Sequence, residues 1–303
     1  MDVCKKFIWI YNRMDHVVNF RRVSDHVALY RYAALDLVPL QQRKLFFAEY
    51  DIRQCLDLRS LNEIRHVETM ERPHSFAEAV VVHMPSGGDS SRLDTVGSSI
   101  VQQSIDDNGV VTFNVNFITP HYIEQCIWRR CPQPLRIKLT EMLNLKQFDM
   151  VVKLIGRDIL GARGIVGTYC DMLNQSYTAI FEALKLVVTC LENDVGGGVG
   201  INCQWGRDRS GILVALIRHV LGDTSQVIIE DYAKSEDGLA LVSHELQLEF
   251  ASQGLGDDFL HAKGETMKQI LEWLDDKFDG IDGYLDWIGF DCSWRDRLVH
   301  LKH

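Results

Sequence analysis

The stretch INCQWGRDRSG, residues 201–211, decides the fold that we predict for this chain. The letters VGINC are typical of a short buried strand, and GILVALIRHVLG is typical of an apolar helix. Between them lies a tight polar loop with Gly206 at its turn, where the missing side chain lets the backbone bend and approach a ligand. Strands that alternate with helices predict a layered α/β fold, in which sites form at the carboxyl ends of strands.

Cys203 and Arg209 are separated by five residues in this loop. The backbone N–H groups of such a turn converge into an anion-binding nest, and the N-terminus of the following helix adds unpaired donors. In that setting we expect Cys203 to be a thiolate at neutral pH. The planar fork of Arg209 suits two oxygens of a phosphate group. The loop therefore predicts a phosphate site with a nucleophile beneath it.

A thiolate below a phosphate-sized cradle is placed to attack phosphorus and form a phosphocysteine. Departure of the leaving group then needs a proton, and hydrolysis needs an activated water, two tasks that one carboxyl group performs in turn. Asp208 in the loop and Asp171 upstream are both candidates, and the choice between them is open at this stage. Ser210 is placed to donate a hydrogen bond to the departing thiolate. The alternative is a structural cysteine beside a surface turn.

The rest of the chain supports the α/β prediction. Strands are expected at 27–35, at 52–60 and, for the letters AVVVHM, at 79–84; helices are expected at 38–50, through 169–194 and around 267–278. Residues 85–110 are rich in Gly, Ser and Asp and predict a flexible loop. We expect one domain over 1–303, with a central, mostly parallel sheet flanked by helices and with residues 66–165 as an inserted, lid-like region.

Composition narrows the classes of function. The chain has 303 residues with 46% hydrophobic residues, which excludes disorder, and a net charge of -10, which argues against nucleic acid as a partner. It contains no apolar run of membrane-spanning length and no signal-peptide pattern, so we expect a cytoplasmic protein without stable membrane insertion. The eight cysteines are scattered and are expected to be reduced. Cys126 and Cys131 lack a second pair at ligand spacing, so no metal and no cofactor are expected.

These segments resemble a known family. CQWGRDRSG resembles the active-site loop of the Cys-x5-Arg protein tyrosine phosphatases, and more closely that of the atypical branch with the loop Cys-x-x-Gly-Lys-Asp-Arg-Thr-Gly, which includes the mycobacterial-type tyrosine phosphatase B and related tyrosine/lipid phosphatases. Further similar segments are NFR (19–21), LYRYAALD (29–36), DLRS (57–60) with Glu63, GTYCDMLNQSYTAI (167–180), DYAKS (231–235) and IDGYLDWIGF (281–290). The resemblance leaves the middle of the chain unmatched.

The resemblance implies roles for the loop residues. Cys203 would be the nucleophile, Arg209 the phosphate-binding arginine and Asp208 the general acid/base. Arg207 takes the place of a lysine thought to favour phosphoinositides as well as phosphotyrosine. Three further residues depart from the family pattern. Asn202 replaces a histidine that tunes the thiolate, Trp205 is bulky enough to narrow the mouth or stack on an aromatic substrate, and Arg22 follows NFR where the family has aspartate. Besides the catalytic residues, we expect substrate contacts from Gln204, Trp205, Gly206, Arg207, Asp171 and Arg59.

Arg59 and Asp57 end a predicted strand, and two interpretations are open. They either buttress the active-site loop or form an ordinary surface ion pair.

The sequence thus predicts a phosphatase for phosphotyrosine, with phosphoserine/threonine or phosphoinositide as further candidate substrates. The alternative is a pseudophosphatase that binds phosphoproteins without turnover, and a third class is another Cys-loop enzyme such as an arsenate reductase or a sulfur transferase. The partner is a phosphorylated protein or a phosphoinositide. The oligomeric state is not predicted.

Overall fold

The computed structural model describes residues 17–36, 38–60, 63–64, 101–105, 109–193 and 196–302. In these ranges one sheet has the strand order β1-β2-β6-β3-β5-β4. Its strands are β1 (Arg21–Ser24), β2 (Val27–Ala33), β3 (Ile52–Asp57), β4 (Val101–Ile105), β5 (Val111–Val115) and β6 (Gly198–Cys203).

The four inner strands β2, β6, β3 and β5 run parallel, and β1 and β4 pair antiparallel at the two edges. This confirms the predicted central, mostly parallel sheet flanked by helices. Because parallel strands end at one edge, the carboxyl ends of the inner four lie together. Cys203 is opposite Ala33 of β2, and Asn202 is opposite Asp57 of β3. The middle strand β6 therefore presents, between its two neighbours, the start of the segment 203–209, which we call the catalytic loop.

Helices make up most of the remaining described chain. They are α2 (Leu40–Glu49), α5 (Pro120–Tyr122), η2 (Ile123–Trp128), α6 (Gln133–Asn144), α7 (Phe148–Ile155), η3 (Gly156–Leu160), α8 (Gly161–Gln175), α9 (Tyr177–Glu192), α10 (Arg209–Val220), α11 (Ser225–Leu239), η4 (Ala240–Val242), α12 (Ser243–Ser252), η5 (Asp257–Leu260), α13 (Gly264–Phe278), α14 (Gly280–Ile288) and α15 (Cys292–His300).

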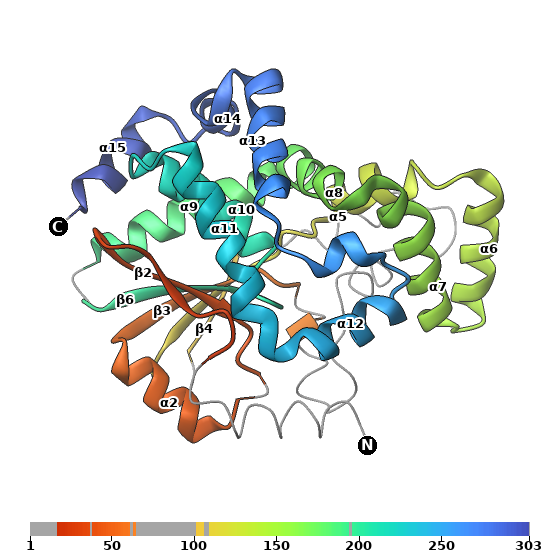
Figure 1. Cartoon of the computed structure of the whole chain (residues 1–303), viewed down its shortest axis with the longest axis horizontal. Helices are drawn as coiled ribbons and strands as arrows, with labels where there is room; N and C mark the ends of the chain where they lie inside the picture. Colours follow the sequence, from red (N-terminus) through yellow and green to blue (C-terminus); the bar gives the residue numbers. More distant parts are fainter. Residues whose placement is uncertain are drawn as a thin grey trace.

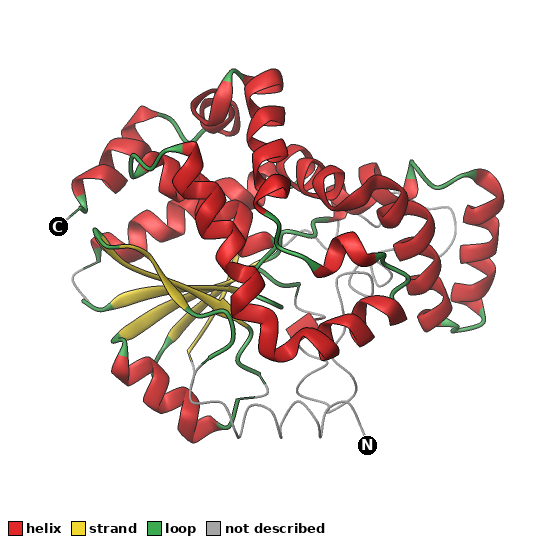
Figure 2. Ribbon diagram, in the orientation of Figure 1, coloured by secondary structure: helices red, strands yellow, loops and turns green. Residues whose placement is uncertain are grey.

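The sheet lies between two unequal layers of helices (Figures 1 and 2). On one side α2 packs on β3, and its Phe46 joins Phe20, Tyr32 and Tyr50 in an aromatic cluster. On the other side α9 and α10 contact β6, and α11, α13 and α15 pack around them. Helix α10 follows the catalytic loop directly, and its residues 209–217 are buried. The loop is thus fixed at both ends by the most buried elements of the fold.

The helix predictions at 38–50, 169–194 and 267–278 are confirmed as α2, as α8 with α9, and as α13. The flexible loop predicted at 85–110 is wrong at 101–105, which is strand β4. Part of the region 66–165, which we predicted as a lid-like insertion, belongs to the sheet itself, because β4 and β5 form one side of it. Strand β5 has only five residues between polar stretches, so its periodicity is too short to identify. The strand predicted at 79–84 lies outside the described residues.

No helix in the described ranges is long and apolar enough to cross a membrane. The described cysteines are all free, and of these only Cys292 is exposed.

Candidate active site

The catalytic loop, residues 203–209, joins the end of β6 to the start of α10. Gly206 forms its turn with a backbone φ of +61°, a value that side chains disfavour. A Cβ atom at this position would lie 2.5 Å from the backbone carbonyl of Tyr32. The loop can pack this closely against β2 only because residue 206 is a glycine.

Three carbonyl groups of the loop are bound from behind. The side-chain amide of Asn19 donates to the carbonyls of Trp205 (3.0 Å) and Gly206 (2.9 Å), and Arg31 Nη2 donates to Gly206 (2.7 Å). The backbone N–H of Ala34 donates to the carbonyl of Gln204 at 3.1 Å. In a trans peptide the C=O and the following N–H point in opposite directions. The N–H groups of residues 205–207 are therefore directed toward the concave side of the loop.

The residues that bind these carbonyls belong to one buried ionic cluster. Asp231 of α11 accepts from Arg31 Nη1 and from Arg21 Nε, both at 3.0 Å, and Arg21 also donates to Ser235. Burial alone would raise the pKa of Asp231, but the charges of Arg31 and Arg21 hold it below its ordinary value. The NFR, LYRYA and DYAKS segments thus meet behind the loop, which explains why they recur with it in the resemblance.

Cys203 lies at the floor of the loop and is 1% exposed. Its Sγ is 3.4 Å from the Oγ of Ser210, in the first turn of α10. Ser210 is therefore within hydrogen-bonding distance of the thiol, and its predicted role toward a thiolate stays a prediction.

Arg209 is held by a bidentate ion pair. Its Nη1 and Nη2 donate to the two carboxylate oxygens of Glu63 at 2.9 and 2.8 Å, and Glu63 also accepts from the backbone N–H of Ser60 at 2.7 Å. Burial opposes the charge of Arg209, but the charge of Glu63 outweighs it and raises the pKa of the guanidinium. The Nε–H group of Arg209 donates to no described residue. Glu63 was singled out only through the resemblance, because a lone glutamate has no pattern of its own.

Arg59 and Asp57 form a buried network instead of the surface ion pair that we considered. Arg59 donates to Asp57 at 2.7 Å and to Asp36, and its Nη1 is 3.5 Å from the side-chain oxygen of Gln204. Asp57 also accepts a hydrogen bond from the side chain of Asn202. The pair therefore lies against the loop, and Asn202 is tied to β3.

Asp208 precedes α10 and is partly exposed. It accepts hydrogen bonds from the hydroxyl of Tyr169 and from Nε of Arg207, the latter at 2.9 Å. The hydroxyl of Tyr232 lies 3.1 Å from that of Tyr169. Burial raises the pKa of both phenols, that of Tyr232 to about 12, so both remain neutral donors at physiological pH.

Arg207 connects the loop to the segment that covers it. It is 1% exposed; its Nη2 donates to the carbonyl of Phe259 at 2.7 Å, and its guanidinium is 5.6 Å from the ring centre of Phe250. The guanidinium of Arg207 thus interacts both with Asp208 of the loop and with this covering segment. We define the cap as residues 249–259, which comprise the end of α12 and most of η5.

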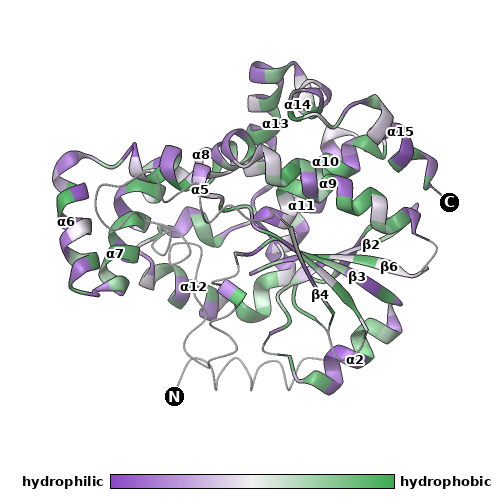
Figure 3. Ribbon diagram, turned by 180° about the vertical axis from the view of Figure 1, so that it is seen from behind, coloured by the Kyte–Doolittle hydropathy of each residue, from purple (hydrophilic) through white to green (hydrophobic). Residues whose placement is uncertain are grey.

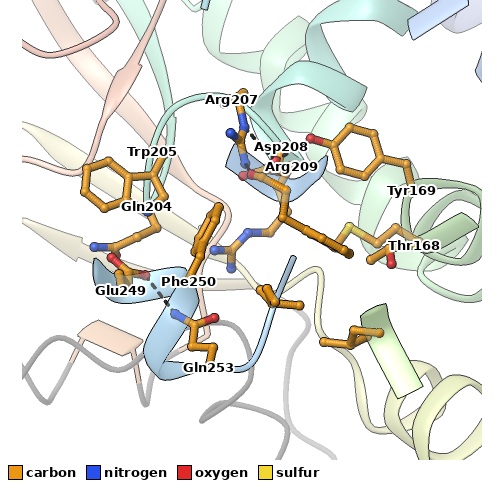
Figure 4. Close-up of a pocket in the computed structure, with 14 residues that line it drawn as sticks. Thr168, Tyr169, Gln204, Trp205, Arg207, Asp208, Arg209, Glu249, Phe250 and Gln253 are labelled. Carbon is orange, nitrogen blue, oxygen red and sulfur yellow. Dashed lines mark hydrogen bonds and ion pairs between the residues drawn. The ribbon is translucent and has the colours of Figure 1, made fainter. Parts of the chain in front are cut away.

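A pocket opens between the catalytic loop, α8 and the cap (Figure 4). Figure 4 shows Gln204 and Trp205 on one side, Tyr169 and Thr168 on the other, and Phe250 between them. The lining residues are Leu160, Thr168, Tyr169, Met172, Gln204, Trp205, Arg207, Asp208, Arg209, Glu249, Phe250, Gln253, Leu255 and Phe259. Of the predicted lid at 66–165, only Leu160 is among these lining residues. The sequence prediction missed the cap, whose apolar residues follow an ordinary helical pattern.

Asp171 does not line this pocket. It lies in the second half of α8, not at a helix N-terminus, and is buried between two arginines. Arg130 Nη2 donates to it at 2.9 Å and Arg163 Nε at 3.0 Å. Asp171 is therefore absent from the lining of this pocket, and its expected substrate contact stays a prediction.

Two comparisons with known proteins give matches to this chain. The model of a family described as "Tyrosine phosphatase family" matches residues 16–301. The triple specificity protein phosphatase PtpB of Mycobacterium tuberculosis (strain ATCC 25618 / H37Rv) is 30% identical over 132 residues. That match covers 39% of this chain and 47% of the relative, so the chain spans about half of the curated protein that it matches.

Proposed function

The chain belongs to the tyrosine phosphatase family, and from this premise we propose that it hydrolyses phosphate monoesters through a phosphocysteine formed on Cys203. The observation that supports the proposal most is the loop itself. Its carbonyls are bound from behind, its N–H groups converge, and a thiol lies at its floor. No other described element combines a nucleophile with such a set of donors.

The phosphate is bound in two ways. The N–H groups of the loop and of the N-terminus of α10 donate hydrogen bonds to its oxygens on one side. Arg209 supplies the other side: Glu63 occupies its two terminal nitrogens, which leaves Nε–H and one Nη2–H as a fork for two oxygens. Because Glu63 is buried and fixed by Ser60, the fork is oriented before the substrate arrives.

The reaction has two displacements at phosphorus. First, the Cys203 thiolate attacks in line, an S–P bond forms, and the ester P–O bond breaks as Asp208 gives its proton to the leaving oxygen. Second, the Asp208 carboxylate accepts a proton from a water, whose oxygen attacks phosphorus and releases the thiolate and inorganic phosphate. Ser210 donates to the thiolate as it departs, from its position 3.4 Å away.

We assign the acid/base role to Asp208 and a structural role to Asp171. Asp208 is in the pocket wall, whereas Asp171 is paired with Arg130 and Arg163 outside it. A carboxyl group must reach the proton that it transfers, so position decides between the two.

The cap and loop favour an aromatic monoester as substrate. Phe250, Trp205 and Tyr169 line the pocket, and aromatic side chains pack well on a phenyl ring. Phosphotyrosine is therefore our first substrate, and phosphoserine/threonine and phosphoinositides are proposed with it because the relative is named a triple specificity phosphatase. Arg207 does not act as a free cation for the phosphate groups of a phosphoinositide, because it already donates hydrogen bonds to Asp208 and to the carbonyl of Phe259. We retain a cytoplasmic location as part of this proposal.

The test is Cys203→Ser, assayed with p-nitrophenyl phosphate. We expect hydrolysis to fall to background, because a serine hydroxyl is not ionised at neutral pH. Cys190→Ser is the matched control: Cys190 is also buried, but it lies in α9 and is not among the residues that line the pocket. Hydrolysis at the parent rate by Cys203→Ser would refute the proposal. Tight phosphopeptide binding by the parent protein without phosphate release would favour the pseudophosphatase instead.

A further inference from the structure

Helices α6 and α7 form a hairpin that stands apart from the sheet. Figures 1 and 3 show the two helices side by side at the end of the molecule farthest from β2 and β6. Large apolar side chains are exposed on it: Ile137 is 67% exposed and Leu145 61%, and Phe148 and Met150 are about half exposed. Residues 144–150 are exposed without interruption. A run of this kind at the tip of a hairpin marks an interaction surface.

The tip has a fixed backbone. The N–H of Gln147 donates to the carbonyl of Met142 at 2.9 Å, and that of Lys146 donates to Leu143 at 3.0 Å, which is the hydrogen-bond pattern of a Schellman motif. Lys146 occupies the left-handed position of this motif, with φ +56°, where glycine is usual. The turn thus holds Leu145, Lys146 and Phe148 together at the end of the hairpin.

The charge of this region differs from that of the whole chain. Residues 129–163 contain eight Arg/Lys and three Asp/Glu, within a chain of net charge -10. Lys138, Lys146 and Lys153 are exposed on the hairpin and form no ion pair with any residue that the structure describes. The overall acidity of the chain, from which we expected no nucleic-acid partner, therefore does not describe this part of the surface.

We propose that the tip of the α6–α7 hairpin docks on the surface of a bilayer that contains anionic phospholipid. Exposed apolar side chains next to lysines are the combination that inserts at the boundary of headgroups and acyl chains, with the ammonium groups at the anionic headgroups. A protein partner with an acidic groove is the competing occupant. The bilayer is favoured because the exposed apolar residues extend to Phe148 and Met150, beyond the hollow on α6 that Ile137 and Leu145 line. The excess of Arg and Lys in residues 129–163 also complements anionic headgroups.

The hairpin is also connected to the pocket. A Cβ atom on Gly156, directly after α7, would overlap the carbonyl oxygen of Gln253 in the cap. Leu160, a few residues further on, lines the pocket itself. Docking through the tip would therefore hold the pocket close to the membrane, where a lipid phosphomonoester is presented. This consequence, unlike the docking, rests on the proposed phosphatase function.

The experiment is co-sedimentation of the full chain with vesicles. We expect binding to vesicles of phosphatidylcholine mixed with phosphatidylserine and none to phosphatidylcholine alone. The double variants Leu145→Ser/Phe148→Ser and Lys138→Glu/Lys146→Glu should each lower the partition coefficient by about tenfold or more. Leu241→Ser/Val299→Ser, two exposed apolar residues on η4 and α15, is the control and should bind as the parent does.

Hydrolysis of p-nitrophenyl phosphate and the thermal midpoint confirm that the variants are folded and should not change. Failure of the parent protein to bind the mixed vesicles would overturn the docking proposal, and so would tip variants that bind as the parent does. Tip variants that only dissociate a dimer, with lipid binding intact, would overturn it in favour of a second copy. If the parent protein does not hydrolyse p-nitrophenyl phosphate, that result would count against the phosphatase proposal and not against the docking proposal.

Discussion

The catalytic loop and the cap form two walls of one pocket, and they are held in different ways. The loop is fixed by buried charged and polar groups, with Asn19 and Arg31 on its carbonyls and Glu63 on Arg209. The cap contacts the loop through apolar side chains and through its Phe259 carbonyl, which accepts a hydrogen bond from Arg207 of the loop.

From this difference we infer that the loop determines the rate of the reaction and the cap determines the choice of substrate. A buried ionic network tolerates few arrangements, because each unpaired charge costs several kcal/mol. Apolar contacts are less directional and permit exchange of one side chain for another. Changes in the loop network should therefore affect the rate of reaction, and changes in the cap should affect the choice of substrate.

The largest effect should come from Arg209. Arg209→Lys keeps a positive charge but removes the fork that Glu63 orients, so we expect kcat/KM to fall by about 10²–10³. Arg297→Lys is the matched control, because Arg297 forms a similar bidentate pair with Glu192 on the surface. Steady-state kinetics on p-nitrophenyl phosphate measure both. An unchanged rate in Arg209→Lys would show that the oriented fork is dispensable.

The next effect separates the two aspartates. Asp208→Asn cannot transfer a proton, and kcat should fall by about 10²–10⁴. Asp171→Asn leaves Arg130 and Arg163 without their shared carboxylate, so it should lower the thermal midpoint while most of the activity remains. The opposite result, with activity lost only in Asp171→Asn, would return the acid/base role to α8.

A smaller effect is expected from Tyr169→Phe. The tyrosine hydroxyl donates to the Asp208 carboxylate and so fixes the position of the proposed acid/base in the pocket wall. Without this bond we expect kcat to fall by about tenfold, with KM little changed because the phenyl ring remains. Tyr284→Phe, which removes a buried hydroxyl bonded to the Leu173 carbonyl, is the control and should leave kcat unchanged. An unchanged kcat in Tyr169→Phe would reduce the tyrosine to a packing residue.

The smallest effect on rate should come from the cap. Phe250→Ala removes an aromatic side chain from the pocket wall, so KM should rise for a phosphotyrosine peptide more than for a phosphoserine peptide, with kcat little changed. Leu248→Ala, an exposed residue on the same helix, should change neither. Equal losses of kcat on both substrates would contradict the division between loop and cap.

The sequence predicted the loop wall well and the cap wall not at all. The loop has a fixed spacing from Cys203 to Arg209 with a glycine between them, and a strand and a helix on either side make that pattern specific. The cap depends on Phe250 and Phe259, apolar residues that occur in any amphipathic helix, so nothing marks them before the chain is folded.

Distance along the chain explains the other differences. Asp171 lies where a general acid is expected, but the two arginines that pair with it, Arg130 and Arg163, both belong to the middle region 66–165. No sequence pattern places these arginines beside Asp171. Strand β5 pairs with β3 from more than fifty positions further along the chain, and no local pattern predicts that pairing. The segments around Asn19, Arg31 and Asp231 were recognised by resemblance, but their common purpose appears only when they meet behind the loop.

The most direct test of the central claim is to trap the covalent intermediate. Asp208→Asn should slow hydrolysis of the phosphocysteine, so rapid acid quenching after mixing with p-nitrophenyl phosphate, followed by peptide mass spectrometry, should detect one phosphoryl group. We predict that this group is on the peptide that contains Cys203. A phosphoryl group on any other residue, or continued turnover with Cys203 unmodified at every time point, would contradict the account.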